Sequence, residues 1–341
     1  MAQGFTRLRK VQIGKQSVIG TAVAATRVLP YQGLVVLDPT RTDPTIDTGS
    51  IDPIMAPYAT VQNVTMQGAT GPATFNDTAI RLSAAIKGGV SPTGSAGVGY
   101  TWTYTAASIT ADPFDYFSVQ TGDETADSGG SGVLGFGGLI DKFSMAFDDT
   151  LGPWTVTDDW VFAGATYGNR TNSLSVDSAP QFVFGADTTI YLDSVAGSIG
   201  ITPIATAVRG ATLTVTNNLD QKRYASGSNT RFNLQDFGRG ARMIELQLVV
   251  EKTAAMITEA NTLSTTPVPN RYIKIGVAST EIAGGATKSS LNIFLPVRLY
   301  SWTEGNIGGN DTYILNYRGF YDSTLTYAFK AVVVNSLSAL P

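Results

Sequence analysis

The chain has 341 residues, of which 43% are hydrophobic and only 15% charged, with a formal net charge of −4. Ordinary soluble domains carry about 25% charged residues, so much of this surface is expected to be covered by another molecule. The chain contains neither cysteine nor histidine. This composition excludes disulfides, zinc–thiolate sites and the histidine of a serine triad, and the negative charge argues against gripping nucleic acid through its phosphates.

Turn-forming and strand-forming residues are abundant, including 36 glycines and many threonines and serines. Several stretches alternate between apolar and polar residues, which is the period of a half-buried strand. These features together predict an all-β architecture with many turns.

Residues 1–30 are rich in small residues, and Arg7, Arg9, Lys10 and Lys15 cluster there. Two interpretations stay open: a frayed terminus, or an N-terminal arm that packs on a neighbouring subunit. The segment has no apolar core of signal-peptide length, and no apolar run approaches the roughly 20 residues of a membrane span. We therefore expect synthesis in the cytoplasm and no membrane insertion.

Residues 38–74 hold a dense set of prolines and aspartates. Such a proline density excludes a helix and a central strand. The segment is predicted to be a long excursion that contains one strand, Ala59–Gln67.

A helix is expected over residues 78–87, capped by Asn76 or Asp77. Its apolar face carries Ala79, Leu82 and Ile86. Gly88-Gly89 ends the helix, because glycine accepts the left-handed conformation common at helix ends. A strand follows at Tyr100–Tyr104, with aromatic residues on one face and threonines on the other.

Further strands are predicted at Tyr116–Thr121, Leu139–Phe147 and Trp154–Ala163. The last two form a hairpin around the turn Asp149–Pro153. The glycine-rich stretch before them, residues 121–138, has the composition of a flexible loop.

The second half repeats this organisation. A strand carrying Ile244, Leu246, Leu248 and Val250 precedes a helix at 253–263, which Pro267 ends. Later strands are expected at Arg271–Ala278, Leu291–Trp302, Thr312–Tyr321 and Tyr327–Val334. The parallel order predicts two similar β-rich halves, 31–175 and 176–341, each with one helix.

Paired carboxylates occur at Asp148-Asp149 and Asp158-Asp159. Adjacent strand residues point to opposite faces, so neither pair can chelate one ion through both side chains. Turn and solvent roles are favoured. An alternative is a carbohydrate-binding β-sandwich, or a glycosidase that uses Asp148 and Asp158 as acid and base.

Other motifs fail on spacing or charge. Gly284–Ser290 lacks the glycine that a phosphate loop needs before Lys288, and Ile140 replaces the third glycine of a dinucleotide fingerprint that would begin at Gly135. The tryptophans could form a stacking platform for single-stranded nucleic acid, but no basic residues are interleaved with them. They are Trp102, Trp154, Trp160 and Trp302. No catalytic, cofactor-binding or metal-binding residue is predicted.

Four segments of the chain resemble the tail tube (major tail) proteins of long-tailed bacteriophages. The helix followed by "KGGVSPTG" and "YTWTY" within Asn76–Tyr104 carries the resemblance first. The pattern G-K-x-S-x-x-G-T-x-V-A-A-T at Gly14–Thr26 and the segments Thr189–Tyr224 and Gly309–Pro341 are also similar to that family.

The resemblance implies a structural virion protein and no enzyme. Its expected fold is a β-sandwich or half-open barrel with one or two short flanking helices, assembled as hexameric rings stacked into a tube. Residues 1–30 would form an arm and residues 38–58 an inter-ring contact. Its expected partners are itself, the tape-measure, tail terminator and tail-tip proteins, and double-stranded DNA passing without specific binding. A tail terminator or baseplate protein of the same fold is the alternative.

Overall fold

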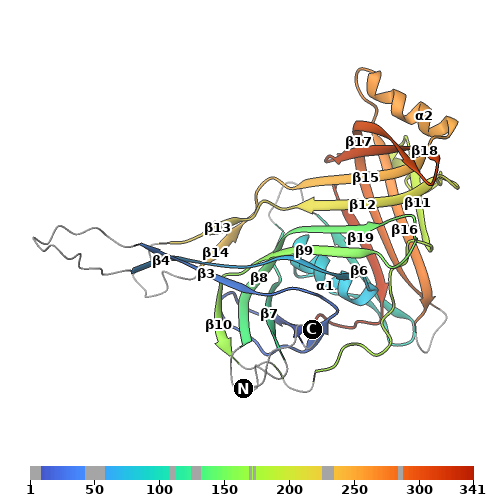
Figure 1. The fold of residues 1–341 in the computed structure, drawn as a ribbon. Helices are drawn as coiled ribbons and strands as arrows, with labels where there is room; N and C mark the ends of the chain where they lie inside the picture. The colour runs from blue at the N-terminus through green and yellow to red at the C-terminus, as the bar shows by residue number, and fades with distance from the viewer. Residues whose placement is uncertain are drawn as a thin grey trace, which may run out of the picture.

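The protein is built mainly from antiparallel strands with two short α-helices, which confirms the predicted fold class (Figure 1). This computed structural model describes residues 9–42, 58–106, 112–123, 132–168, 171, 174–224, 234–282 and 287–341. The predicted inter-ring loop falls mostly outside these ranges. Its two ends are described, and they are the paired strands β3 and β4.

The largest structural feature is one continuous antiparallel sheet, here called the main sheet. Its strands follow the spatial order β3-β4-β9-β8-β12-β15-β18-β17. Their bounds are β3 Val36–Thr42, β4 Tyr58–Pro72, β9 Thr155–Val161, β8 Gly132–Phe147, β12 Val208–Thr216, β15 Met243–Glu251, β18 Asn310–Gly319 and β17 Lys288–Ile307.

Two long strands, β8 and β17, each leave the main sheet and enter a second one. The first half of β8 lies between β7 (Tyr116–Asp123) and β10 (Gly164–Gly168). The first half of β17 lies between β16 (Arg271–Glu281) and β19 (Lys330–Asn335). Strands that flank these smaller sheets are β1 Arg9–Gln16, β2 Arg27–Leu29, β5 Thr93–Ser95, β6 Gly99–Thr105 and β11 Thr188–Asp193, and β13 Asp220–Lys222 pairs with β14 Asp236–Gly238.

The strand pairings divide the chain into two units of the same topology. The first unit has the spatial order β1-β7-β8-β9-β4-β3, and the second has β11-β16-β17-β18-β15-β12. The order along the chain also corresponds, with α1 (Phe75–Ala85) after β4 and α2 (Ala254–Asn261) after β15. β10 and β19 then cover equivalent edges of β8 and β17.

A bulge occurs at the same place in both units. The register between β8 and β9 shifts between Ile140 and Lys142, and that between β17 and β18 shifts between Leu299 and Ser301. Each bulge lies where the long strand passes from its smaller sheet into the main sheet. Bulges bend a strand and increase its twist, so both units use the same device to turn the long strand.

The first helix, α1, begins and ends earlier than the sequence indicates. Thr74 is its N-cap: its Oγ1 accepts from Asp77 N–H at 3.1 Å and donates to Asp77 Oδ2 at 2.6 Å. Asp77 is therefore the third residue of the helix, bonded to the N-cap side chain, rather than the cap itself. The apolar face found from the sequence is correct, since Ala79, Leu82 and Ile86 are all buried.

The two helices differ in burial, and only α2 lies at the flank of the sheets. Helix α1 packs against β8 on one side and against β19, β17 and β6 on the other. All but one of its residues are buried, Asn76 being the exception. α1 is thus a core helix between two sheets, whereas α2 is exposed on its outer side and ends in a short 3-10 turn at Thr262–Ser264.

Two segments differ from their predicted roles. Within the predicted arm, Arg9–Gln16 and Arg27–Leu29 form β1 and β2, which pair inside the chain's own sheet, and residues 1–8 lie outside the described part. Residues 132–138 form a strand instead of a loop. A Cβ at Gly135 would lie 2.7 Å from Cδ1 of Phe162, so glycine is needed here to admit an aromatic ring.

Candidate functional surface

The main sheet has one buried face and one polar face. The buried face carries Phe143, Met145, Leu213, Leu246, Leu315 and their neighbours, and this face covers the core. The opposite face carries two rows of residues, and within each row the residues are direct partners on neighbouring strands. One row is Thr157, Ser144, Thr214, Glu245 and Arg318, and the other is Thr155, Ala146, Thr212, Gln247, Asn316 and Ser301.

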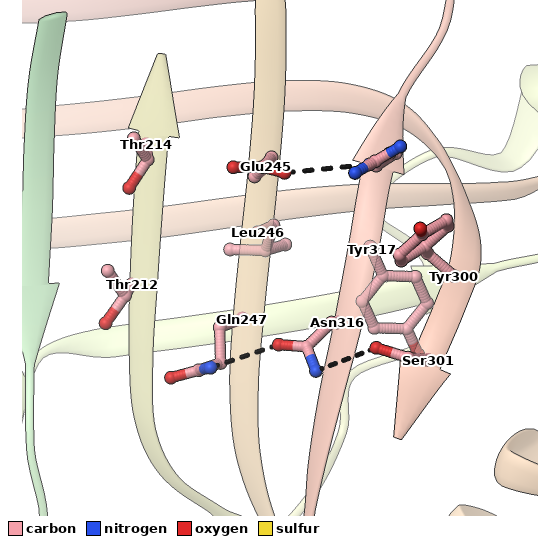
Figure 2. A pocket seen from close by; sticks show the side chains of 10 residues that line it. Thr212, Thr214, Glu245, Leu246, Gln247, Tyr300, Ser301, Asn316 and Tyr317 are labelled. Atoms are coloured by element: carbon pink, nitrogen blue, oxygen red, sulfur yellow. Dashed lines mark hydrogen bonds and ion pairs between the residues drawn. The ribbon is translucent and has the colours of Figure 1, made fainter. Parts of the chain in front are cut away.

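Side chains within this polar face bind one another. Gln247 Nε2 donates to Asn316 Oδ1 at 3.0 Å, and Asn316 Nδ2 donates to Ser301 Oγ at 3.1 Å (Figure 2). The Arg318 guanidinium lies 3.6 Å from Glu245 and 3.9 Å from the ring centroid of Tyr300. These residues enclose a shallow depression of about 310 Å³, open to solvent. Such partnered, partly exposed groups have little residual capacity for tight ligand binding.

Charges on the polar face balance. Among the described side chains, the positive ones include Lys142, Arg209, Arg298 and Arg318, and the negative ones include Asp38, Asp159, Glu245 and Glu251. Some opposite charges are neighbours, because Lys142 is paired across the strands with Asp159 and Arg318 with Glu245. A balanced face of this kind lacks the basic stripe of a phosphate-binding surface.

The acid–base pair considered from the sequence does not form. Asp158 is 0% exposed and lies opposite Phe143, on the core side of the sheet. Asp148 is exposed, five residues beyond Phe143, and its carboxylate accepts from Thr150 N–H at 3.0 Å. That separation is about 16 Å along a strand, too long for a glycosidase pair. Hydrogen bonds from Thr150 lower the pKa of Asp148, which is a turn residue.

Asp158 instead joins a buried cluster with Arg81 and Tyr31. Arg81 Nε lies 3.0 Å from Asp158 Oδ2, and the Tyr31 hydroxyl donates to the same oxygen. Burial raises the pKa of Asp158, although the Arg81 charge opposes this shift. Desolvation also raises the pKa of Tyr31 well above its usual value, so the phenol stays neutral. The cluster fixes α1 to β9 and has no access to solvent.

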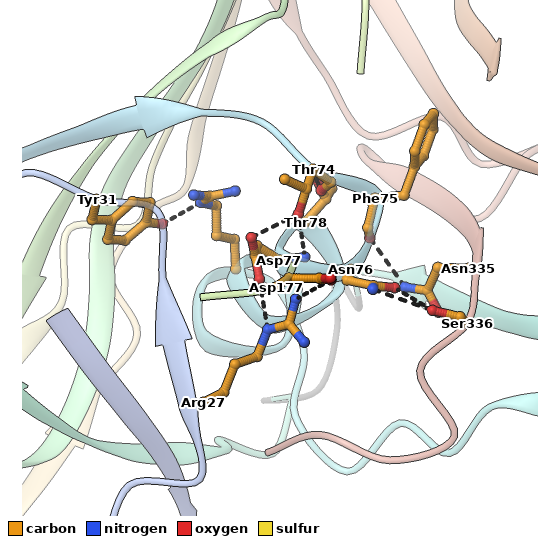
Figure 3. A network of polar contacts seen from close by, with 11 residues as sticks. Arg27, Tyr31, Thr74, Phe75, Asn76, Asp77, Thr78, Asp177, Asn335 and Ser336 are labelled. Atoms are coloured by element: carbon orange, nitrogen blue, oxygen red, sulfur yellow. Dashed lines mark hydrogen bonds and ion pairs between the residues drawn. The ribbon is translucent and has the colours of Figure 1, made fainter. Parts of the chain in front are cut away.

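A second polar network holds the start of α1. Arg27 Nε donates to Asp77 Oδ1 at 2.9 Å, and Asn335 Nδ2 donates to the Phe75 carbonyl at 3.0 Å (Figure 3). Arg27 also approaches Asp177 at 3.7 Å. These contacts connect β2, α1 and the end of β19. The network is structural, because each group is used to fix one of these segments to another.

The remaining sequence motifs are structural as well. Trp102, Trp154 and Trp160 are at most 1% exposed, which excludes a stacking platform at these three positions. Trp302 is half-buried, and its ring lies 5.0 Å from that of Tyr313 in an edge-on arrangement. Lys288 begins β17, whereas residues 284–286 of the rejected phosphate loop lie outside the described part.

The polar face was not identified from the sequence. Its signal is present in the alternation Thr212, Thr214, Thr216 of β12, which resembles that of any half-exposed strand. Only the register shows that threonine, serine and amide rows from both units align on one surface. Within the described ranges, no group of three or more acidic residues could hold a metal ion. No helix of the described chain is both long and apolar enough to cross a membrane.

No family model matches the chain, and no curated protein matches it in sequence.

Proposed function

We propose that this protein is a structural tail tube protein, which polymerises as stacked rings into the conduit that carries double-stranded DNA from a phage into its host. The observation that carries the proposal is the main sheet. It runs through two units of equal topology, has one polar and charge-balanced face, and ends in β3 and in the second half of β17, neither of which pairs with a further strand of the described residues along its outer edge.

A sheet of this design suits the wall of a channel. Unpaired edge strands pair readily with other strands, and a closed ring removes such edges. With the polar face turned inward, threonine, serine and amide side chains would line the channel. Balanced charge would let DNA slide, because no excess of lysine and arginine is present to release its counterions.

The two units change the expected number of chains in a ring. The resemblance implies a hexameric ring, and this chain contains two units of equal topology. Six divided by two gives three chains per ring, so we propose a trimer with pseudo-hexameric symmetry in place of a hexamer of chains. The tape-measure protein would occupy the channel during assembly, and terminator and tail-tip proteins would cap the tube.

The β3–β4 hairpin supports a contact between rings. Residues 43–57 connect these strands, and the equivalent connection in the second unit contains β13 and β14. Arg223, beyond β13, lies 3.3 Å from Asn63 of β4, so the two excursions are neighbours. Replacing residues 43–57 with a two-residue Asn-Gly turn should leave the unfolding transition unchanged and shorten or abolish tubes in negative-stain images. Normal tubes would contradict the inter-ring role.

Negative-stain microscopy of the purified chain tests the proposed function. Long tubes that grow with protein concentration are expected. Discrete rings that never lengthen would favour a tail terminator or baseplate protein of similar fold. A chain that stays monomeric at every concentration tested would contradict both interpretations.

A further inference from the structure

The first unit and the second unit are joined inside the chain by an antiparallel strand pair, called here the internal joint. It consists of the second half of β8 and β12, with Phe147 opposite Ala211 and Lys142 opposite Thr216. β8 is the long strand of its unit, and β12 is the outermost strand of the other unit. The internal joint therefore shows how one such unit adds to the next.

Each strand of the internal joint has an equivalent with an open edge. The equivalent of β8 is β17, whose second half pairs with β18 and with no other described strand. The equivalent of β12 is β3, which pairs with β4 and with no other strand in the described ranges. The two open edges lie at opposite ends of the main sheet. Each edge is therefore available to pair with a strand of another copy.

We infer that copies of this chain join head to tail, with β3 of one copy pairing antiparallel with the second half of β17 of the next copy. The expectation that the joined copies form a tube, with three chains per ring, rests on the proposed function. The joint itself follows from the repeat. Contacts between unlike edges are heterologous and generate rings or open filaments.

The repeat also fixes the register. Ser301 and Lys142 are equivalent because each is the first paired residue after the bulge. Thr303 and Ser144, two residues further along their strands, are therefore equivalent as well. The pairs of β4 and β15 make Val36 equivalent to Thr214, since Thr65 and Glu245 occupy matching positions. Thr214 lies opposite Ser144 in the internal joint. Val36 of one copy should therefore lie opposite Thr303 of the next.

Side chains at the two edges fit this register. Leu34 and Val36 are 43% and 48% exposed in the single chain. In the inferred joint Leu34 lies opposite Gly305, whose missing side chain leaves room for it. Leu37 lies opposite Trp302, and both are half-buried in the single chain. Pairing would remove these apolar groups from water.

The joint is limited at both ends of β3. The Val35 N–H already donates to Thr121 Oγ1 at 3.0 Å, and Pro39 has no N–H to donate. Backbone pairing is thus confined to about Val36–Asp38 against Ser301–Thr303. With so few backbone pairs, association of two copies should be reversible. Its strength should depend on the apolar contacts beside the paired strands.

Disulfide trapping tests the joint, because the chain has no cysteine of its own. Directly opposed residues have Cβ atoms about 4.5–5.5 Å apart, which a disulfide can bridge with little movement. The double variant Val36→Cys/Thr303→Cys should give a ladder of linked chains on a non-reducing gel after mild oxidation. With three chains per ring, the ladder should stop at the trimer.

Controls come from the same molecule. Thr214→Cys/Ser144→Cys occupies the internal joint and should form a disulfide within one chain, without a ladder. Val36→Cys/Asn316→Cys places the second thiol on the neighbouring strand β18 and should give no ladder. Each single variant should give at most a linked dimer.

The outcomes separate the joint from the proposed function. Tubes in the micrographs without a Val36–Thr303 ladder would overturn the joint and leave the tube intact. A ladder with no tubes would support the joint and contradict the tube. A ladder equally strong in the Asn316 control would overturn the register. A ladder that extends to the hexamer would keep the joint and contradict three chains per ring.

Discussion

Replacing Arg81 with methionine tests the buried ion pair between α1 and β9. The Arg81 and Asp158 side chains are 2% and 0% exposed, and Nε of the arginine lies 3.0 Å from the carboxylate. Two unit charges at this distance attract by about 5 kcal/mol at an effective dielectric constant of about 20. Removing one partner leaves the other charge buried without compensation, so Arg81→Met should lower the free energy of unfolding by about 3–5 kcal/mol.

Arg209→Met is the matched control. Arg209 and Glu251 form an ion pair of 2.6 Å, but their side chains are 34% and 33% exposed. Water and salt screen such a pair, so the control should lose about 0–1 kcal/mol. The assay is urea denaturation followed by tryptophan fluorescence. A loss for Arg81→Met no larger than that of the control would refute the argument.

The pH dependence of the Arg81→Met variant follows from the pKa of Asp158. Burial already raises this pKa above its ordinary value of 3.8, and the Arg81 charge is the main effect that opposes the rise. The variant should raise it further. A native carboxyl with a raised pKa binds its proton more tightly than the unfolded chain does, so stability falls as pH rises from 3.8 through the native pKa. The loss should therefore be smaller near pH 5 than near pH 8, and the double variant Arg81→Met/Asp158→Asn should remove this difference.

The remaining predictions concern the long strand and the polar face. Gly135→Ala should destabilise the protein by about 1–3 kcal/mol through overpacking against Phe162, whereas Gly168→Ala, which would meet no atom within 4 Å, should change the free energy of unfolding little. Thr157→Lys and Thr214→Lys should leave stability within about 0.5 kcal/mol. In assembled protein, however, they should create salt-sensitive binding of double-stranded DNA in fluorescence anisotropy, and unchanged anisotropy would contradict a channel-facing position.

The sequence predicts much of the strand content because most strands have one solvent-exposed face and one buried face. The alternation Ile244, Leu246, Leu248 and Val250 gives β15 correctly, and the hairpin of β8 and β9 follows from the same pattern around a proline-containing turn. The repeat was visible only as a similar order of elements. The equal strand order of the two units became visible only in the strand pairings. These pairings join distant parts of the chain, and the periodicity of a single sequence does not encode them.

The errors have physical causes. Residues 132–138 have the composition of a loop, but their glycines make space for Phe162, which follows β9, and this tertiary contact outweighs local propensity. The N-cap of α1 was placed too late because Asn76 and Asp77 are also good caps, although the side chain that caps the helix is that of Thr74. Residues 9–29 lack clear alternation because β1 is buried at several consecutive positions.

A helical reconstruction of the assembled protein by cryo-electron microscopy tests the central claim most directly. The proposal predicts a hollow tube in which each chain supplies two units to a ring, and in which Thr214 and Gln247 face the channel. A tube with this polar face turned outward, or with the buried apolar face opened toward the channel, would contradict the account.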